Sequence, residues 1–364
     1  MKRMRITPGC YLAFGLLFVV SPPAPASEIF PYDAKLEVLP NGLKIVSVPV
    51  NPSKEISYFT IFRSGGRAPA AQGDAAGAEL YGRIGAETRR IVAADFYGDF
   101  ISFCGREYLA EVVRVEAARV SRLSLGEGGA PLTPADTILL VAGDINRDEL
   151  LPLLRSAYAP WQGPAGSPGP TVNKGSAPSI GQGFEPPVPG RVRLVFRGPS
   201  FSDRDADKAA LDLLASSVFS AASPLGRKLI LEEGRCLSLE AVCEDRRSSG
   251  LFILQAEARD ERDRAFIESA IEAELARLRT EPLPSRILAD AVSNKKSTLA
   301  VSIAAPGEMA RVLAHYLGLS GDPGTVDRLF ALYEKITPVD VRTMVRKYLG
   351  PENRLAATDK GGRR

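Results

Sequence analysis

The sequence is almost without histidine, since His315 is the only one among 364 residues. Zinc hydrolases with an HExxH or HxxEH motif need two imidazoles one helical turn apart, so this count excludes both motifs. A Ser-His-Asp triad needs a single imidazole beside a nucleophile. His315 lies in EMARVLAHYLG among apolar positions, and we interpret it as a partly buried structural histidine rather than a metal ligand or base. P-loop, dinucleotide and GxSxG motifs are also missing.

Cysteine is scarce as well. Of the four cysteines, Cys10 lies near the N-terminus, which leaves Cys104, Cys236 and Cys243 for the body of the chain. An odd number without a CxxC pair argues against a disulfide framework and against a thiolate zinc site. Two readings stay open: Cys236 and Cys243 pair if their strands fold back on each other, or all three are buried thiols that pack as small hydrophobic groups.

The N-terminus has the three parts of a secretory signal peptide: a basic start, an apolar run over residues 11–20, and the small-residue site Ala24-Pro25-Ala26. The run is too short to span a bilayer as a permanent helix, and an uncleaved interfacial anchor is the alternative. We expect cleavage near Ala26 and a periplasmic or secreted protein. Removing the three bases of residues 1–26 brings the formal net charge from +3 to zero, which excludes bulk attraction to nucleic acid or anionic lipid.

A Gly- and Pro-rich segment divides the rest of the chain. Residues 159–190 hold fifteen Gly and Pro in thirty-two positions, a composition that prevents a helix or a central strand and is typical of a linker. We therefore predict a signal peptide (1–26), a first domain (27–158), a linker (159–190), a second domain (191–358) and a basic tail (359–364).

Both halves show strands and helices in a similar order. Alternating or β-branched runs predict strands, and apolar residues at i+3 and i+4 spacing predict helices. The strands are expected at 43–50, 56–63, 98–104, 137–143, 192–198, 236–243, 250–258 and 353–359. The helices are expected at 75–83, 107–122, 145–158, 208–221, 262–279, 309–317, 326–336 and 339–349. The pattern predicts an α+β fold of two homologous domains, each a mostly antiparallel sheet with helices packed on one face, the first domain truncated.

Several segments resemble the insulinase/pitrilysin family of zinc metallopeptidases. They include LPNGLKIVSVPV and FRSGGR at the start, TILLVAGDINRDELLPLLRSAYAPW at the end of the first half, and SPLGRKLILEEGRCLSLEA and TPVDVRTMVRKYLGPENR in the second. The likeness extends over nearly all of residues 33–358 and depends on the number, order and spacing of these segments. It implies two domains of the family fold that close like a clamshell around a chamber.

The zinc motif of that family is missing here. In the family an HxxEH helix follows the second strand and, with a later Glu, binds zinc, while the motif Glu acts as general base on the metal-bound water. The matching stretch, GDAAGAELYGRI, offers Glu79 but no imidazole, and zinc prefers several N or S donors. The helix with the third ligand is also absent, and Glu127 is a lone acid in a Gly-rich loop. We predict no catalytic residue, no metal site and no cofactor.

The second half departs from the family as well. The resemblance implies an Arg and a Tyr seven residues apart that contact substrate, but those places fall on Ile230 and Leu237. Neither side chain can donate a hydrogen bond. Arg227 and Arg235 are nearby in a different register, and we interpret them as surface charges.

The resemblance leaves peptide binding as a function that needs no metal. Family members add extended peptides as a strand to an open sheet edge, through backbone hydrogen bonds. The edge here is residues 85–91, with Ala86, Glu87, Thr88 and Arg89 at its centre; an ordinary strand with a solvated face is the alternative.

We therefore expect a non-catalytic homologue that pairs with an active HxxEH-bearing subunit and completes its peptide chamber. Two alternatives are an active zinc-dependent endopeptidase with unrecognised ligands and a stand-alone periplasmic peptide-binding or scaffold protein.

Overall fold

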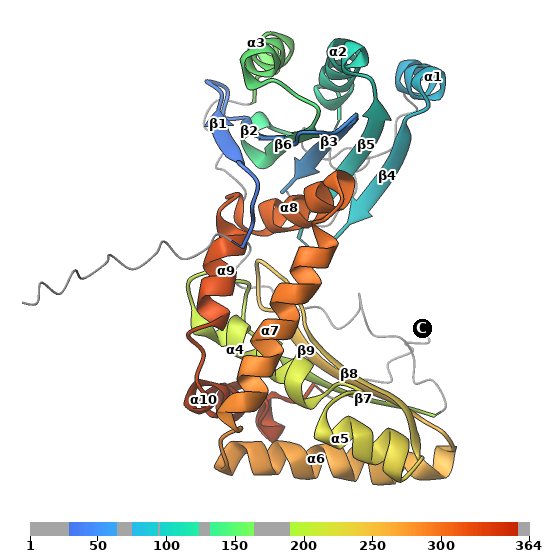
Figure 1. The fold of residues 1–364 in the computed structure, drawn as a ribbon, viewed down its shortest axis with the longest axis vertical. Coiled ribbons are helices and arrows are strands. Elements are labelled where there is room, and N and C mark those ends of the chain that lie inside the picture. Colours follow the sequence, from blue (N-terminus) through green and yellow to red (C-terminus); the bar gives the residue numbers. More distant parts are fainter. Residues whose placement is uncertain (1–28, 64–74, 94, 124–131, 164–189, 356–364) are drawn as a thin grey trace, which may run out of the picture.

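A computed structural model describes residues 29–63, 75–93, 95–123, 132–163 and 190–355. The predicted signal peptide, Glu127, most of the predicted linker and the basic tail lie outside these residues. Figure 1 shows an elongated molecule in which a larger sheet with three covering helices lies at one end and a smaller sheet with its own helices at the other. The two predicted halves of the chain each contribute one of these sheets.

The first sheet has six strands in the order β1-β2-β6-β3-β5-β4. All neighbouring strands are antiparallel except β2 and β6, which are parallel. The strands are β1 (Lys35–Val38), β2 (Lys44–Pro49), β3 (Glu55–Phe62), β4 (Glu87–Val92), β5 (Tyr97–Cys104) and β6 (Thr137–Gly143). The prediction of a mostly antiparallel sheet is confirmed, and β1 is a strand that the sequence pattern did not predict.

Both faces of this sheet are covered at its centre. On the outer face lie α1 (Ala75–Ile84), α2 (Leu109–Val120) and α3 (Arg147–Tyr158), which share a core with Tyr58 of β3 and Leu139 of β6. The alternate residues Phe59 and Leu140 point to the opposite face and belong to a second core. That core is completed by α8 (Pro306–Ser320), a helix from the second half, which packs on β3 and β6. The first domain's own helices lie on one face of this sheet, as predicted, and the opposite face is covered by α8 of the second half.

The second sheet is a three-stranded antiparallel sheet in the order β7-β9-β8. Its strands are β7 (Arg191–Arg197), β8 (Cys236–Cys243) and β9 (Leu251–Ala258), and its helices are α4 (Ala206–Val218), α5 (Pro224–Arg227), α6 (Arg264–Thr280), α7 (Ser285–Ser302), α9 (Thr325–Tyr333) and α10 (Pro338–Tyr348). At the N-terminus of α10, Thr337 and Asp340 form a reciprocal capping box. The 18-residue α7 was not predicted because it buries only Leu288, Ala291 and Leu299.

The predicted last strand over 353–359 is not formed as expected within the described residues. A short 3-10 turn takes Pro351–Asn353, and Arg354 makes an isolated bridge to Phe196 of β7. Residues 356–364 lie outside the part of the chain that the structure describes.

The C-terminal end of α8 is tied to the first sheet by polar contacts. The guanidinium of Arg63, just after β3, donates from Nε to the carbonyl of Gly318 and from Nη2 to that of Leu319, each at 3.1 Å. These carbonyls have no partner further along the helix, so the guanidinium caps the helix end where cations are favoured. Burial, together with the charge of Arg247, lowers the pKa of Arg63 to about 10. Gly321 ends α8 in the left-handed conformation with a φ of 79°.

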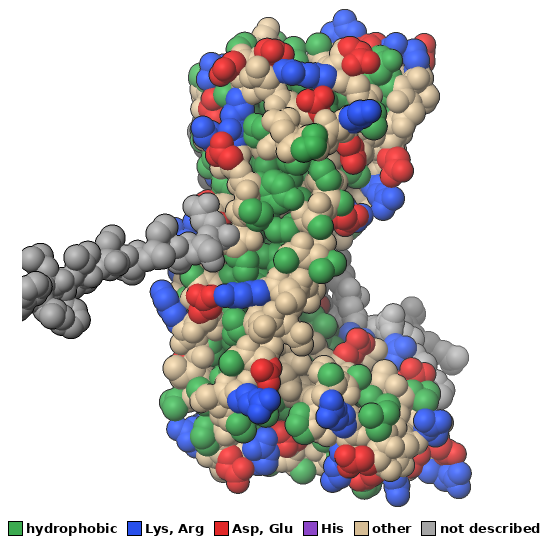
Figure 2. All heavy atoms as spheres, viewed as in Figure 1, with side chains coloured by type: hydrophobic (Ala, Val, Ile, Leu, Met, Phe, Trp, Pro, Cys, Tyr) green, Lys and Arg blue, Asp and Glu red, His purple; other side chains and the backbone are tan. Residues whose placement is uncertain are grey.

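Hydrophobic side chains at the surface are concentrated in one region of the molecule. Figure 2 shows them gathered along the middle of the molecule, over α8 and beside α7, while charged side chains are more frequent at both ends. One core cluster runs from the inner face of the first sheet through α8 into the second half, whereas the outer face of the first sheet has a core of its own. Of the helices in the described ranges, none is both long and apolar enough to cross a membrane.

The packing of α8 can be tested at Gly318. A Cβ added there would lie 2.5 Å from Cγ of Phe96, a ring that is itself buried. We expect Gly318→Ala to lower the free energy of unfolding by about 1–3 kcal/mol because the core is overpacked. Gly82→Ala in α1 is the matched control: no atom lies within 4 Å of its added Cβ, and the helix should gain about 0.5–1 kcal/mol. Urea denaturation measures both, and equal effects would contradict the close approach.

Candidate functional site

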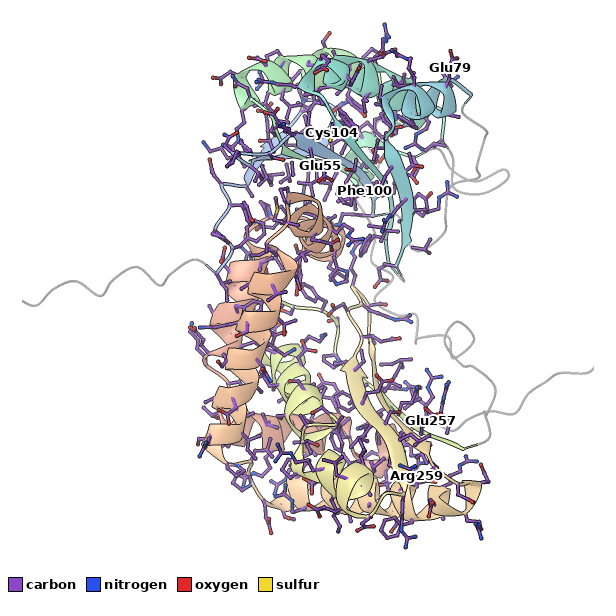
Figure 3. The ribbon with its side chains drawn as sticks, turned by 45° about the vertical axis from the view of Figure 1, so that its right-hand side comes forward. Glu55, Glu79, Phe100, Cys104, Glu257 and Arg259 are labelled. Carbon is purple, nitrogen blue, oxygen red and sulfur yellow. The ribbon has the colours of Figure 1, made fainter. Side chains whose placement is uncertain are left out.

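The stretch that corresponds to the zinc motif forms α1 and the turn that leads into β4. Leu80 of α1 is buried against the sheet, whereas Glu79 is exposed. Figure 3 shows Glu79 on the outer side of α1, away from the other labelled residues of this half. The helix ends at Gly85, whose φ of 62° suits glycine. The chain then enters β4 at Glu87.

The side chains near α1 do not fit a zinc ion. Within the described ranges, no group of three His, Cys, Asp or Glu side chains is placed to hold a metal. The one imidazole, on His315, is on α8, where its Nε2 lies 2.8 Å from Oδ2 of Asp245. The donor set expected for the family is therefore not brought together, and we derive no chemistry from a metal at this place.

A buried ion-pair network lies between α1, α2 and the strands β4 and β5. Glu116 of α2 is only 1% exposed and accepts a 2.5 Å hydrogen bond from the hydroxyl of Tyr81 on α1. Arg119 donates to both oxygens of Glu116, at 2.9 and 2.7 Å, and reaches Asp99 of β5 at 2.8 Å. Burial alone would lower the pKa of Arg119, but the hydrogen bonds and charges of Glu116 and Asp99 raise it above its ordinary value.

This network borders a cavity of about 470 Å³ with Ala78 and Tyr81 of α1, residues of β4 and β5, and Glu116 and Arg119 in its walls. The two carboxylates on its walls are both held by Arg119. A guanidinium that makes bidentate contact with one carboxylate and a further bond to another satisfies most of their acceptor capacity. The arrangement stabilises the join between α2 and the sheet and leaves few free oxygens for a cation.

The predicted peptide-binding residues lie at the edge of the six-stranded sheet. Ala86 precedes β4, and Glu87, Thr88 and Arg89 form its first half. β4 is the last strand of the sheet and pairs only with β5 among the strands described. Glu87, Thr88 and Arg89 are all exposed. An edge strand presents unpaired backbone groups on its free side.

A groove of about 350 Å³ runs beside this edge, between β4, β5 and the first turn of α8. It is lined by Glu55, Ile84, Gly85, Glu87, Arg89, Phe100, Ser102, Phe103, Cys104, Gly307, Glu308 and Arg311. Figure 3 shows Glu55, Phe100 and Cys104 near one another on the sheet above α8. Ser102 donates a hydrogen bond to Glu55, and Glu308 pairs with Arg311. The groove therefore combines an aromatic floor with charges of both signs.

The residues of the second half that correspond to the family's substrate contacts do not line this groove. Ile230 is partly buried in a short helical turn, and Leu237 of β8 is 47% exposed. Arg235 pairs with Asp263 at 3.3 Å and lies over the ring of Phe266. Figure 3 shows Glu257 of β9 and Arg259, just after this strand, far from the groove beside β4. The interpretation of Arg235 as a surface charge agrees with these contacts.

The cysteines form no disulfide, and only two of the three described thiols are buried. All three described cysteines are free. Cys236 and Cys243 are the two ends of β8, and an extended strand of this length holds their Cα atoms far beyond the reach of a disulfide. Both are buried, and burial raises the pKa of Cys243 to about 12. Cys104 is exposed, so the expectation of three buried thiols is wrong for that residue.

Residues 131–295 match the family model described as the peptidase M16 inactive domain. A protease from Helicobacter pylori has the same fold, with a TM-score of 0.70 and 16% identity over 89% of this chain and 98% of that one. No curated protein matches the sequence.

Two further solved structures have the same fold. A peptidase M16 inactive domain from Pseudomonas fluorescens gives a TM-score of 0.61 at 14% identity, over 88% of this chain and 96% of that one. Pitrilysin gives 0.68 at 13% identity, over 89% of this chain but 44% of that one.

The fold is thus that of one half of an M16 clamshell, made of two sheets joined by shared helices. The family model over residues 131–295 and the shared fold both agree with the resemblance to the insulinase/pitrilysin family of M16 peptidases. The family model that matches is that of the inactive domain, which supports a non-catalytic homologue.

The network around Glu116 yields a stability prediction. Arg119→Met would leave the buried Glu116 without its cation, so we expect the free energy of unfolding to fall by about 3–5 kcal/mol. Arg114 lies on the same helix with a side chain that is 76% exposed, and Arg114→Met should change stability by less than about 0.5 kcal/mol. Adding Glu116→Gln to Arg119→Met should recover part of the loss. Urea denaturation of the three variants checks this, and an unchanged midpoint for Arg119→Met would contradict it.

Proposed function

We propose that this protein is a non-catalytic M16 subunit that pairs with an active, HxxEH-bearing zinc peptidase of the same family. The observation that carries the proposal is the combination of an intact fold with a donor set that does not fit zinc. The cores on both faces of the first sheet are filled, yet the side chains around α1 form ion pairs among themselves. A scaffold of this kind can complete a chamber without contributing to the chemistry.

Its contribution to the pair would be peptide binding along β4. Strand addition depends on backbone hydrogen bonds, and the free edge of β4 presents such groups beside the groove between β4, β5 and α8. The groove contains the basic residues Arg89 and Arg311 and the acidic residues Glu55, Glu87 and Glu308. Acidic or basic side chains of a bound peptide would therefore lie near a residue of opposite charge. The signal-peptide pattern supports a place for the pair in the periplasm or outside the cell.

The pairing is tested by reconstitution. We expect the purified chain alone to bind no stoichiometric zinc and to cleave no peptide, because the donors are missing, and to form a stable heterodimer with an exported HxxEH-bearing protein of the same organism. Metal analysis, a peptidase assay and size-exclusion chromatography at micromolar concentration measure these outcomes. Chelator-sensitive proteolysis by the homogeneous chain would instead favour an active endopeptidase. Absence of any complex would favour a stand-alone binding protein.

Strand addition is tested by proline substitution in β4. Successive residues of an edge strand point their N–H groups alternately to the neighbouring strand and to the free side. Thr88→Pro and Arg89→Pro therefore each remove one N–H, only one of them on the free side. We expect the variant that loses the N–H directed at β5 to be less stable. The variant that loses the N–H on the free side should keep its unfolding midpoint but bind fluorescent unstructured peptides at least about tenfold more weakly. Wild-type binding by the stable variant would rule out docking on this edge.

A further inference from the structure

A cavity of about 810 Å³ is lined by residues of the second half. Residues of α7 and α8 form its sides, and α4 and α9 contribute Ser216, Phe330 and Tyr333. Leu299, Phe330 and Tyr333 are buried and give it an apolar lining. A cavity of this size with an apolar lining and a few polar groups is typical of a ligand site.

Two polar groups in its wall have no hydrogen-bond or ion-pair partner within the described part of the chain. The ammonium of Lys295, on α7, forms no hydrogen bond or ion pair there and lies 5.2 Å from the centroid of the Tyr333 ring. The hydroxyl of Tyr316, on α8, likewise has no hydrogen-bond partner among the described residues, although the ring packs against the core. Both groups can donate hydrogen bonds, and the ammonium can only donate. The wall thus favours an acceptor, and a negatively charged one most of all.

The wall behind these groups is held rigid by a buried charge network. Lys208 of α4, 2% exposed, contacts Asp212 at 2.6 Å and Asp245 at 2.8 Å. Asp245 in turn pairs with His315, and Tyr333 donates to Asp212 at 2.9 Å. Burial opposes ionisation of Asp245, but the hydrogen bond from His315 and the charge of Lys208 hold its pKa well below the usual range. These contacts fix His315 and Tyr333 in place, and they give both Asp212 and Asp245 an ion-pair partner in Lys208 and a further hydrogen-bond partner.

The cavity adjoins the groove beside β4. Glu308 and Arg311 of α8 line both spaces, so an extended chain that leaves the groove past these residues reaches Lys295 and Tyr316 next. Glu308 pairs with Arg311, which leaves Lys295 as the cation in the cavity wall without a carboxylate partner. A chain that ends in the cavity would place a negative charge there if its last residue carries a free carboxylate.

We propose that this cavity binds the C-terminal residue of an extended peptide: an apolar or aromatic side chain lies against Leu299 and Phe330, and the terminal carboxylate bonds to Lys295 and Tyr316. The inference rests on the proposed function to the extent that the rest of the peptide pairs with β4. It adds that the protein selects peptides with a free, apolar C-terminus.

A small probe tests the cavity without β4. N-acetylphenylalanine carries the side chain and the carboxylate, and N-acetylphenylalaninamide carries the side chain alone. We expect the acid to bind the full chain about tenfold more tightly than the amide in NMR titrations, because a charge-assisted hydrogen bond is lost in the amide. Lys295→Met should remove this preference, and Tyr316→Phe should reduce it. Lys296→Met is the matched control, since the neighbouring Lys296 pairs with Glu334 and is outside the cavity wall.

Filling the cavity gives a second, independent test. Thr298 is an exposed residue of α7 that lines the cavity, and Ser297 is an exposed neighbour that does not. Thr298→Trp should abolish binding of the acid, while Ser297→Trp should leave it unchanged and control for the added indole. Equal affinity for acid and amide, equal effects of the two tryptophans, or no binding of either probe would overturn the inference.

The outcomes also separate this inference from the proposed function. A fluorescent peptide with an amidated, polar C-terminus depends on β4 alone. If it binds and responds to proline in β4 while the acid probe does not bind, strand addition stands and the cavity inference fails. If the acid probe binds with the expected preference but peptides ignore the β4 variants, the cavity stands and strand addition fails.

Discussion

The structure depends on the packing of α8 against the inner face of the first sheet. This helix belongs to the second half in sequence but buries Phe59 and Leu140 of the first half, and Arg63 caps its C-terminal carbonyls. Because one apolar core continues from sheet to sheet, neither half can be removed without exposing the other. The relative position of β4, the groove and the large cavity follows from this one contact, since α8 lines both spaces.

The residues that maintain the fold differ from those at the place of the family's zinc motif. The fold is maintained by the cores above and below β3 and β6, and neither core requires a metal. Near α1, Arg119 pairs with both Glu116 and Asp99, and Arg90 also pairs with Asp99, so the carboxylates there already have cationic partners within the protein. Stability and zinc binding are separable in this architecture because they use different residues.

Much of the fold could be predicted from the sequence, and the failures have physical causes. Segments with a clear period, such as β2, β5, α3 and α10, lie within a few residues of their expected bounds. α7 was missed because its few buried residues give almost no apolar periodicity. The runs ISYFTIF and TILLVAG are almost continuously apolar, which is typical of strands that are buried on both faces. This pattern predicts a second covering layer over the first sheet.

The sequence by itself determined the chemistry that is impossible here: one histidine cannot supply an HxxEH motif, whatever the fold. It also determined the helices and strands whose side-chain period is set locally. Only the tertiary structure decided that α8 crosses to the first sheet, that Lys208, Asp245 and His315 meet, and that Lys295 and Tyr316 face one cavity. These pairings join residues distant in the chain, and local periodicity contains no information about which distant faces will share a core.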